Sequence, residues 1–552
     1  MRRAPRASKY DRKALRSSSM VTVMRSFRES PLAGGRLKPE CRMAPTGGQF
    51  QTVPERPALH IQQPERGTAL ILMTSRTPGA SPRSAPKTTA VASLAGWTAL
   101  VLAPDDATSM QSATPTVLHP VAGVPMVRLI CDLLHEAGCT HVVVVGGANP
   151  ALLTTALGDG VPIVDARDAK DSASATLQSR SVAAEQEHIL ILRADMPLIT
   201  TRTLLEVAGR HLGGGRTLTC VTAYLTDPHG FGRILRRNGE VQGIVRERDL
   251  TGAMRGEPEV NAGLYAAEAP WLWETLATLD PSGGSDSLSD LVAHAVKHDR
   301  VEAFQVTEAI EVMQVGDRVQ LAEADRILRD RIRALVMREG VTLMDPSTIY
   351  IDAGVTIGSD TVLLPGTHII GATTIGGGCR IGPNAILRDM TIGEGCEIGG
   401  STLEGSIVGD RVTVGPYCHV RPDSTLERDV HLGNYAEVKA SRVGERTAVG
   451  HFSYIGDSDV GADVNFGAGS ITANYDGVLK HRTIIGDGVH LGSDTVMVAP
   501  VTVGAGARTG AGAVVIDDVA PGATVVGVPA REVGTRAQNA AGNDAGEGGH
   551  PA

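Results

Sequence analysis

Apolar and polar positions alternate in blocks over the first half of this 552-residue chain. Thr98–Ala103, His141–Val145 and Ile189–Leu192 are short apolar runs that predict buried strands, and Pro125–Ala137 predicts a helix between the first two. Strands that alternate with helices are typical of a mostly parallel sheet with helices on both faces. We therefore expect an α/β Rossmann-like domain over residues 93–316, with its ligand at the carboxyl ends of the strands.

The pattern then becomes helical over Asp317–Glu339. Apolar side chains recur there at three- and four-residue steps, at Leu321, Ala324, Leu328, Ile332 and Leu335. Gly340 ends this pattern. The sequence thus predicts a linker helix within residues 317–345.

After Tyr350 an aliphatic residue followed by glycine recurs with a period of six. Examples are Ile375–Gly376, Ile381–Gly382, Val408–Gly409 and Val414–Gly415. This hexapeptide repeat predicts a left-handed parallel β-helix over residues 346–535, in which coils stack to bury an inner ladder of aliphatic side chains. A purely structural solenoid has the same pattern, so function depends on residues that depart from it.

The two ends of the chain differ from the rest in charge and composition. Residues 1–90 hold 17 Lys and Arg against 5 Asp and Glu and are rich in Pro and Ser. We expect a basic disordered extension over residues 1–92, with a transit-like leader or an upstream start before Met73 as alternatives, and a disordered tail over 536–552. The net charge of −9 gives no indication of nucleic-acid binding.

Cysteine usage and hydropathy indicate the compartment. The seven cysteines lack CxxC spacing, which argues against zinc sites and disulfide frameworks. No apolar run approaches the roughly 20 residues of a membrane span. We expect a protein without a membrane span, in the reducing cytoplasm.

Two stretches interrupt the repeat and bring in polar chemistry. Gly450–Ser470 places a histidine, a tyrosine and an asparagine among the coils, and Ile471–Arg482 predicts a projecting polar loop. Arg421, Lys439 and Lys480 supply positive charge suited to a phosphate. His451 has a reference pKa near 6.5 and can take a proton from an amine. This clustering favours a catalytic site over an inert solenoid.

Several strings carry a family resemblance: "VRPDSTLERDVHLGNYAEVKAS", "GHFSYIGD", "VNFGAGSITANYDG" and "IIGDGVHLGSDTVMVAPVTVG". Residues from about 96 to 530 resemble the bacterial bifunctional N-acetylglucosamine-1-phosphate uridyltransferase/glucosamine-1-phosphate N-acetyltransferase family. The resemblance implies a nucleotidyltransferase-type α/β domain and an acetyltransferase β-helix. It also implies a homotrimer with the acetyltransferase site between adjacent β-helices.

The resemblance assigns a role to each matching residue of the β-helix. His451 would deprotonate the sugar amine, and attack on acetyl-CoA would be direct, without an acyl-enzyme. The residues that would hold glucosamine 1-phosphate are Arg421, Lys439, Tyr454, Asn465 and Lys480. Those that would line the acetyl-CoA groove are Ala468, Asn474, Tyr475, Ser493 and Ala511.

The uridyltransferase half departs from the family in its phosphate loop. The stretch "LVLAPDDATSMQSATPTVLH" keeps the frame of the family pattern L-x-x-G-x-G-T-R-M followed by P-K-V-L-H. The two glycines are replaced by Asp105 and Ala107, the arginine by Ser109 and the lysine by Thr116. Glycine backbones let amides approach phosphate oxygens, while Arg and Lys offset their charge. These contributions are therefore missing.

Further departures affect the base and the metal. Ala169–Leu177 replaces the uracil-contacting pattern, Arg246 replaces a glutamate, and Gly316 replaces the asparagine that would be the second magnesium ligand. Three residues of the site are retained, namely Asp195 as the other metal ligand, Gly232 and Asn261. One carboxylate alone is a poor Mg²⁺ site. We expect uridyl transfer to be lost, and Mg²⁺ to be used only if this half is active.

The leading hypothesis is acetyl-CoA-dependent conversion of glucosamine 1-phosphate into N-acetylglucosamine 1-phosphate, which feeds UDP-N-acetylglucosamine and peptidoglycan precursors of the cell wall. One alternative is a fully bifunctional enzyme that also makes UDP-N-acetylglucosamine from UTP. The other is a non-catalytic trimeric scaffold or regulatory homologue. A different amino sugar could also fit the same His, Arg and Lys residues as the acetyl acceptor.

Overall fold

The computed structural model describes residues 91–104, 109–147, 149–183, 186–279, 287–298 and 300–535. The predicted extension over 1–92, apart from its last two residues, and the predicted tail over 536–552 lie outside these ranges. The substitutions at Asp105 and Ala107 also lie outside them.

The α/β domain is built on one sheet, and the predicted strands are confirmed. Four neighbouring strands run parallel, in the order β6 (His188–Arg193), β1 (Trp97–Ala103), β4 (His141–Gly146) and β5 (Ile163–Asp165). The sheet continues beyond β6 through the antiparallel β10 (Glu259–Glu268) to β7 (Leu218–Tyr224) and β11 (Val301–Gln305). β8 (Arg233–Arg237) and β9 (Glu240–Val245) branch from β10.

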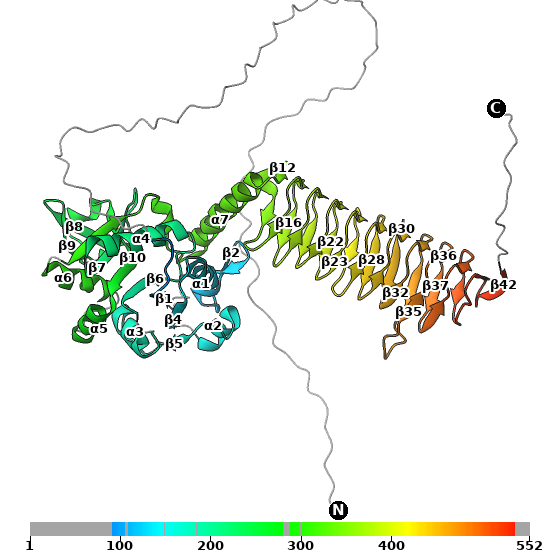
Figure 1. Ribbon diagram of the computed structural model, residues 1–552, viewed down its shortest axis with the longest axis horizontal. Coiled ribbons are helices and arrows are strands. Elements are labelled where there is room, and N and C mark those ends of the chain that lie inside the picture. The colour runs from blue at the N-terminus through cyan, green and yellow to red at the C-terminus, as the bar shows by residue number, and fades with distance from the viewer. Residues whose placement is uncertain are drawn as a thin grey trace, which may run out of the picture. The chain divides into compact units, whose positions relative to one another are not determined.

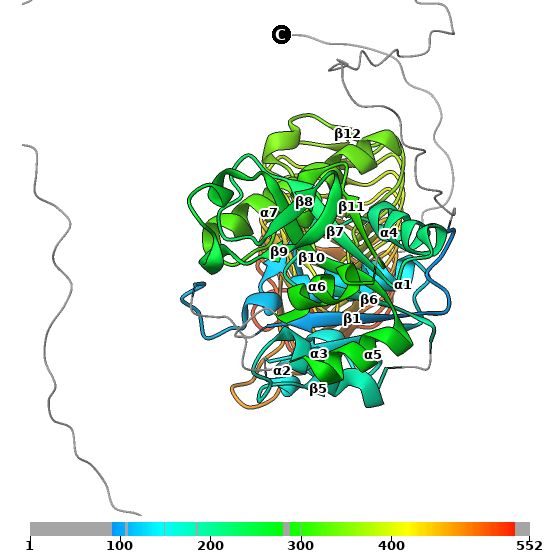
Figure 2. The ribbon, with the colours of Figure 1, turned by 90° about the vertical axis from the view of Figure 1, so that its left-hand side faces the viewer.

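Helices cover both faces of this sheet, as Figure 2 shows. Successive strand residues point to opposite faces, so Val101 and Leu100 of β1 belong to two different buried clusters. Val101 shares its cluster with residues of α1 (Met126–Glu136), α2 (Pro150–Leu157) and α4 (Thr201–Gly214). Leu100 shares its cluster with residues of α3 (Ser172–Gln178), α5 (Ala269–Thr278) and α6 (Asp290–Val296).

The predicted linker helix is α7 (Arg318–Arg338). The Asp317 carboxylate caps it by accepting from the backbone N–H groups of Val319 and Gln320. Gly340 follows with a φ of +98°, a left-handed conformation that favours glycine and ends the helix. β12 (Thr342–Leu343) already pairs with a strand of the solenoid, so the β-helix begins inside the interval 317–345 and not at 346.

A parallel β-helix follows, as the repeat predicts (Figure 1). A short antiparallel hairpin of β2 (Pro120–Val121) and β3 (Val124–Pro125) belongs to the other domain. The first solenoid sheet consists of β12, β15 (Val362–Leu363), β18 (Arg380–Ile381), β21 (Glu397–Ile398), β24 (Thr413–Val414), β27 (His431–Leu432), β30 (Ala448–Val449), β33 (Asn465–Phe466), β36 (His490–Leu491), β39 (Arg508–Thr509), β41 (Ala523–Val526) and β42 (Arg531–Thr535).

Two further sheets complete the solenoid. The second consists of β13 (Tyr350–Ile351), β16 (His368–Ile370), β19 (Ile386–Arg388), β22 (Thr402–Glu404), β25 (His419–Val420), β28 (Ala436–Lys439), β31 (Ser453–Gly456), β34 (Ile471–Ala473), β37 (Val496–Val498) and β40 (Val514–Val515). The third consists of β14 (Thr356–Ile357), β17 (Thr374–Ile375), β20 (Thr391–Ile392), β23 (Ile407–Val408), β26 (Thr425–Leu426), β29 (Arg442–Val443), β32 (Ser458–Val460), β35 (Thr483–Ile485) and β38 (Val501–Val503).

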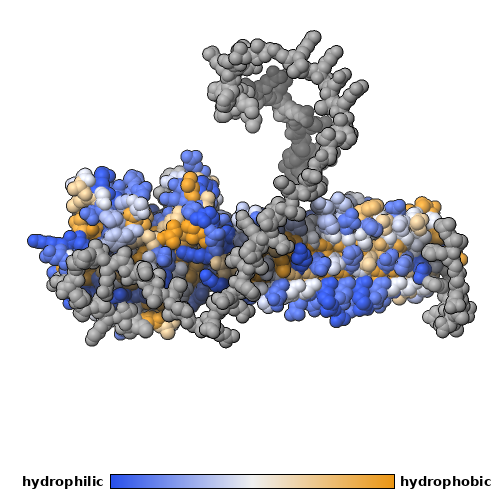
Figure 3. Space-filling view, turned by 90° about the horizontal axis from the view of Figure 1, so that it is seen from above, coloured by the Kyte–Doolittle hydropathy of each residue, from blue (hydrophilic) through white to orange (hydrophobic). Residues whose placement is uncertain are grey.

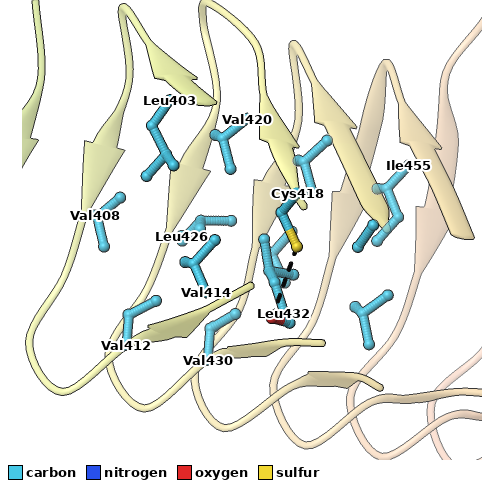
Figure 4. Close-up of a cluster of buried hydrophobic side chains, with 14 of the residues drawn as sticks. Leu403, Val408, Val412, Val414, Cys418, Val420, Leu426, Val430, Leu432 and Ile455 are labelled. Carbon is cyan, nitrogen blue, oxygen red and sulfur yellow. Dashed lines mark hydrogen bonds between the residues drawn. The ribbon is translucent and has the colours of Figure 1, made fainter. Parts of the chain in front are cut away.

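The inner ladder of the solenoid is aliphatic. Leu403, Val420, Val438 and Ile455 pair in register on four successive coils, and each is fully buried. Figure 4 labels Leu403, Val420 and Ile455. Cys418 lies among them, with its Sγ 3.8 Å from the carbonyl oxygen of Leu432. Burial of each such aliphatic side chain contributes about 1.5–3 kcal/mol. A hydrophilic band runs along one edge of the solenoid's outer surface in Figure 3.

Candidate functional sites

Four predicted residues of the acetyltransferase site lie at one corner of successive coils. Val449 pairs with Phe466, and Phe466 pairs with Leu491. His451, Ala468 and Ser493 each follow one of these residues by two positions, so they occupy equivalent places. Ala511 follows Thr509 of β39 in the same way.

Backbone hydrogen bonds hold this corner together. The N–H of Asp494 donates to the Ala468 carbonyl at 2.7 Å, and the N–H of Gly512 donates to the Ser493 carbonyl at 2.8 Å. His451, Ser493 and Ala511 are exposed. The corner therefore brings the predicted base into one column with three predicted cofactor-lining residues.

A polar cluster lies on the second sheet, around Asp457. Its Oδ2 lies 3.7 Å from Nζ of Lys439 and accepts a short hydrogen bond from Nδ2 of Asn474. The same Asn474 amide lies 3.4 Å from the hydroxyl of Tyr454. The structure thus joins Lys439, Tyr454 and Asn474 through a carboxylate that the sequence analysis did not single out. In the sequence, the feature that could have indicated Asp457 is an acidic residue directly after the repeat pair Ile455–Gly456.

The predicted projecting loop brings Lys480 to the same cluster. Tyr475 and Lys480 form an antiparallel bridge, and the N–H of His481 donates to the Asn474 carbonyl at 2.8 Å. The neighbouring Lys439 ammonium lowers the pKa of Lys480, through a hydrogen bond and through its charge. The two ammonium groups repel each other, and the Asp457 carboxylate, whose charge raises the pKa of Lys480, offsets part of this repulsion.

Arg421 lies one coil before Lys439 on the same sheet. Val420 pairs with Val438, so the residues that follow them, Arg421 and Lys439, occupy equivalent positions. The guanidinium of Arg421 lies 2.9 Å from the carboxylate of Glu437. Asn465 belongs instead to the first sheet, in register with Ala448 and His490. Among the described residues, no hydrogen bond joins Asn465 to the lysine cluster.

In the α/β domain the retained Asp195 is engaged by Arg193. Nε of Arg193 lies 3.0 Å from Oδ1 of Asp195, and Nη2 lies 2.5 Å from Oδ2. The backbone N–H of Val315 donates to the Asp195 carbonyl, so the next residue, Gly316, lies near Asp195 in space. This contact of Arg193 could not be predicted from the sequence, because only the side-chain geometry at the end of β6 reveals it.

Gly232 and Asn261, which the resemblance assigns to the uridyltransferase site, lie next to each other. The N–H of Asn261 donates to the Gly232 carbonyl at 2.9 Å, and both line a cavity together with Arg193. A second cavity of about 680 Å³ is lined by Arg193 and by residues of the stretch Ala169–Leu177. That stretch therefore does face a ligand-sized space at the carboxyl ends of β1 and β4.

Of the other substituted positions, Arg246 lines a further cavity together with Gly232 and Asn261. Arg246 forms an ion pair with Asp249 at 2.8 Å. Thr116 is buried in the short 3-10 turn Thr116–Leu118, whereas Ser109 is exposed. Neither side chain carries the positive charge that the family pattern places there.

A nucleotidyltransferase-type α/β domain followed by a hexapeptide β-helix defines a two-domain transferase. Residues 99–255 match the family model of the MobA-like NTP transferase domain. Residues 354–389 match that of the bacterial transferase hexapeptide with six repeats. This match confirms the predicted α/β and β-helix fold classes.

The chain belongs to the family of the bifunctional protein GlmU. It is 40% identical to the protein of that name from Heliobacterium modesticaldum, over 78% of this chain and 95% of the relative. It is 39% identical to that from Trichlorobacter lovleyi, over 77% and 94%, and 40% identical to that from Geobacillus thermodenitrificans, over 78% and 95%.

These comparisons bear on two expectations. The relatives are named bifunctional and match over most of the chain, so nothing in the comparisons indicates that the uridyltransferase half is degenerate. Within the described ranges, no helix has both the length and the apolar character needed to cross a bilayer.

Proposed function

We propose that the β-helix transfers an acetyl group from acetyl-CoA to the amine of glucosamine 1-phosphate. The observation that carries this proposal is the cluster of Lys439, Tyr454 and Asn474 around Asp457, with Lys480 close enough for the Lys439 ammonium to lower its pKa. A phosphate offsets two neighbouring ammonium charges, which is the chemistry that a sugar phosphate brings. The exposed His451 on the adjoining corner supplies a base for the amine.

The proposed reaction is a direct displacement. The amine nitrogen attacks the thioester carbonyl, the C–N bond forms, and the C–S bond breaks as CoA leaves with the electron pair. His451 takes the proton from the amine, and the CoA thiolate regains a proton from solvent. Arg421, Lys439, Tyr454, Asn465 and Lys480 would hold the sugar phosphate, while Ala468, Asn474, Tyr475, Ser493 and Ala511 would line the acetyl-CoA groove.

The active unit would be a homotrimer, with the site completed between neighbouring β-helices. Tyr417, Tyr435 and Phe452 support this, because they are large, exposed and one coil apart. The rings of Tyr417 and Tyr435 stack at 5.4 Å between centroids. Exposed aromatic side chains gathered in this way are typical of protein–protein contacts. Light scattering of the purified protein would test the trimer.

A second candidate function retains uridyl transfer in the α/β domain, and family membership favours it. The loss of this activity, our first hypothesis, is supported only by residues: the charge lost at Ser109 and Thr116, the Arg246 substitution and the engagement of Asp195 by Arg193. An assay of pyrophosphate released from UTP, in the presence of N-acetylglucosamine 1-phosphate and Mg²⁺, distinguishes retention of uridyl transfer from its loss. A steady release rate supports the bifunctional enzyme.

Acetyl transfer is tested by following the CoA thiol released by the full-length protein, with glucosamine 1-phosphate and other amino sugars as acceptors. The proposal predicts turnover that is strongest with glucosamine 1-phosphate and lost in His451→Ala. His431→Ala is a matched control, because His431 is an exposed histidine of β27 outside the predicted site. Silence in this assay and in the pyrophosphate assay, with the trimer intact, would favour the scaffold.

A further inference from the structure

The Asp195 carboxylate is fully engaged by a guanidinium. Arg193 ends β6, and its fork contacts both carboxylate oxygens, at 3.0 Å and 2.5 Å. The Asp195 side chain is only 6% exposed, whereas the Arg193 side chain is 30% exposed, so the carboxylate is the shielded member of the pair. Bidentate Arg–carboxylate pairs of this kind are strong and directional. A divalent cation at Asp195 would share the carboxylate with the positively charged guanidinium, which repels it.

Within the ranges that the structure describes, no second side-chain metal ligand stands beside this pair. Gly316 has no side chain, and its backbone N–H donates to Oε1 of Gln320 at 2.8 Å. The next carboxylate along the chain, Asp317, caps α7. Among the residues that the structure describes, no group of three or more His, Cys, Asp or Glu side chains could hold a metal ion. Mg²⁺ takes oxygen ligands in near-octahedral geometry, which these residues do not fit.

The space beside the pair is nevertheless suited to a ligand. Arg193 lines two of the cavities, and the larger of them, of about 680 Å³, lies within the usual size of small-molecule sites. Lys170 lines it with an exposed side chain that pairs with no acid among the described residues. Asp171 also lines it, but its Oδ1 accepts from the N–H of Ser174 as the cap of α3.

We propose that this α/β cavity binds a phosphate-bearing ligand without a divalent cation, because Arg193 and not a metal is the partner of Asp195. The positive charge that meets the phosphate comes from Lys170, because Asp195 already offsets the charge of Arg193. This inference concerns the α/β domain alone and does not depend on acetyl transfer by the β-helix.

The metal arm of the test uses Mn²⁺ as a spectroscopic probe. Electron paramagnetic resonance measures free Mn²⁺ in titrations of the full-length wild type, Arg193→Gln, Asp195→Asn and the double variant. We expect the wild type and Asp195→Asn to bind Mn²⁺ equally, and Arg193→Gln to gain a site that the double variant loses. A wild-type site that disappears in Asp195→Asn would overturn the inference.

The ligand arm uses UMP and N-acetylglucosamine 1-phosphate, monophosphates that bind Mg²⁺ weakly in solution. Calorimetric dissociation constants are compared in EDTA and in Mg²⁺, with the thermal melt of each variant as a folding control. We expect at least one probe to bind, its two constants to agree within about threefold, and Lys170→Ala to weaken binding at least about fivefold. Tenfold tighter binding in Mg²⁺, or no binding of either probe, contradicts the proposal.

Discussion

Nζ of Lys439 lies 3.7 Å from Oδ2 of Asp457, and that carboxylate also accepts a hydrogen bond from Asn474. Asp457 thereby links a strand residue, Lys439, to the start of the loop that carries Lys480. Asp457 does not itself belong to the proposed substrate site, but it positions residues that we propose to bind the sugar phosphate. Substitutions at this cluster should therefore change substrate binding before they change the chemical step.

Lys439→Ala is expected to raise the KM for glucosamine 1-phosphate about 10- to 100-fold, because a charge-assisted contact with the phosphate contributes about 1.5–3 kcal/mol. The kcat should change far less. Lys297→Ala serves as a control, since Lys297 is an exposed lysine at the end of α6 in the other domain. Steady-state kinetics with varied sugar phosphate measure both constants. An unchanged KM in Lys439→Ala would remove this lysine from the phosphate site.

Asp457→Asn is expected to change the electrostatics of the same cluster without removing either lysine. The substitution removes the negative charge between Lys439 and Asn474, so the repulsion between Lys439 and Lys480 is no longer offset. The pKa of Lys480 should fall further below its ordinary value. NMR titration of labelled lysines reports this shift, and a rise in that pKa would contradict the arrangement.

The stability of the α/β domain should depend on pH through His211. This histidine is 2% exposed, and its ring packs 5.3 Å from that of His188. Burial, and then the charge of His188, lower the pKa of His211 from 6.5 to about 4. Between these values the unfolded chain binds a proton that the folded domain does not, so stability is present above pH 6.5 and falls as the pH falls toward 4.

The corresponding loss is about 3 kcal/mol for an isolated group. Urea unfolding followed by tryptophan fluorescence measures it at several pH values, because the three tryptophans all lie in the α/β domain and the ring of Trp97 lies 5.7 Å from that of His211. His211→Phe should flatten the dependence of the unfolding free energy on pH. The same slope in the variant and in the wild type would show that another group is responsible.

A single cavity in the inner aliphatic ladder is expected to lower the stability of the solenoid strongly. Leu403→Ala removes a fully buried side chain between stacked coils and should lower the free energy of unfolding by about 2–5 kcal/mol. Leu479→Ala is the matched control, because Leu479 is 61% exposed in the projecting loop. Chemical denaturation of both variants tests the difference. Equal midpoints would contradict the packing of the ladder.

Elements with a strict period could be predicted from the sequence. The helix pattern ending at Gly340 corresponds to α7, and the aliphatic–glycine repeat corresponds to the parallel solenoid, because both periods follow directly from backbone geometry. The register of the solenoid also brings His451, Ala468 and Ser493 to one corner. Their common role in acetyl transfer stays a prediction.

Pairings between side chains could not be predicted in the same way. The sequence indicates Asp195 as a retained metal ligand, whereas the structure gives both of its oxygens to Arg193, two residues earlier. Arg193 ends β6 and Asp195 lies in the turn after it, so whether the Arg193 side chain reaches the carboxylate depends on rotamers and neighbours, not on the strand period. Asp457 was missed for a similar reason, since its contacts join residues from separate coils.

The most direct test of the central claim is acetyl-CoA-dependent turnover of glucosamine 1-phosphate by the full-length protein and by His451→Ala. A general base contributes about 10²- to 10⁴-fold, so the variant should lose at least about a hundredfold in kcat while the trimer and its thermal melt are unchanged. Wild-type turnover with this loss is the predicted result. Equal turnover in His451→Ala, or no turnover of glucosamine 1-phosphate by the wild type, would contradict the account.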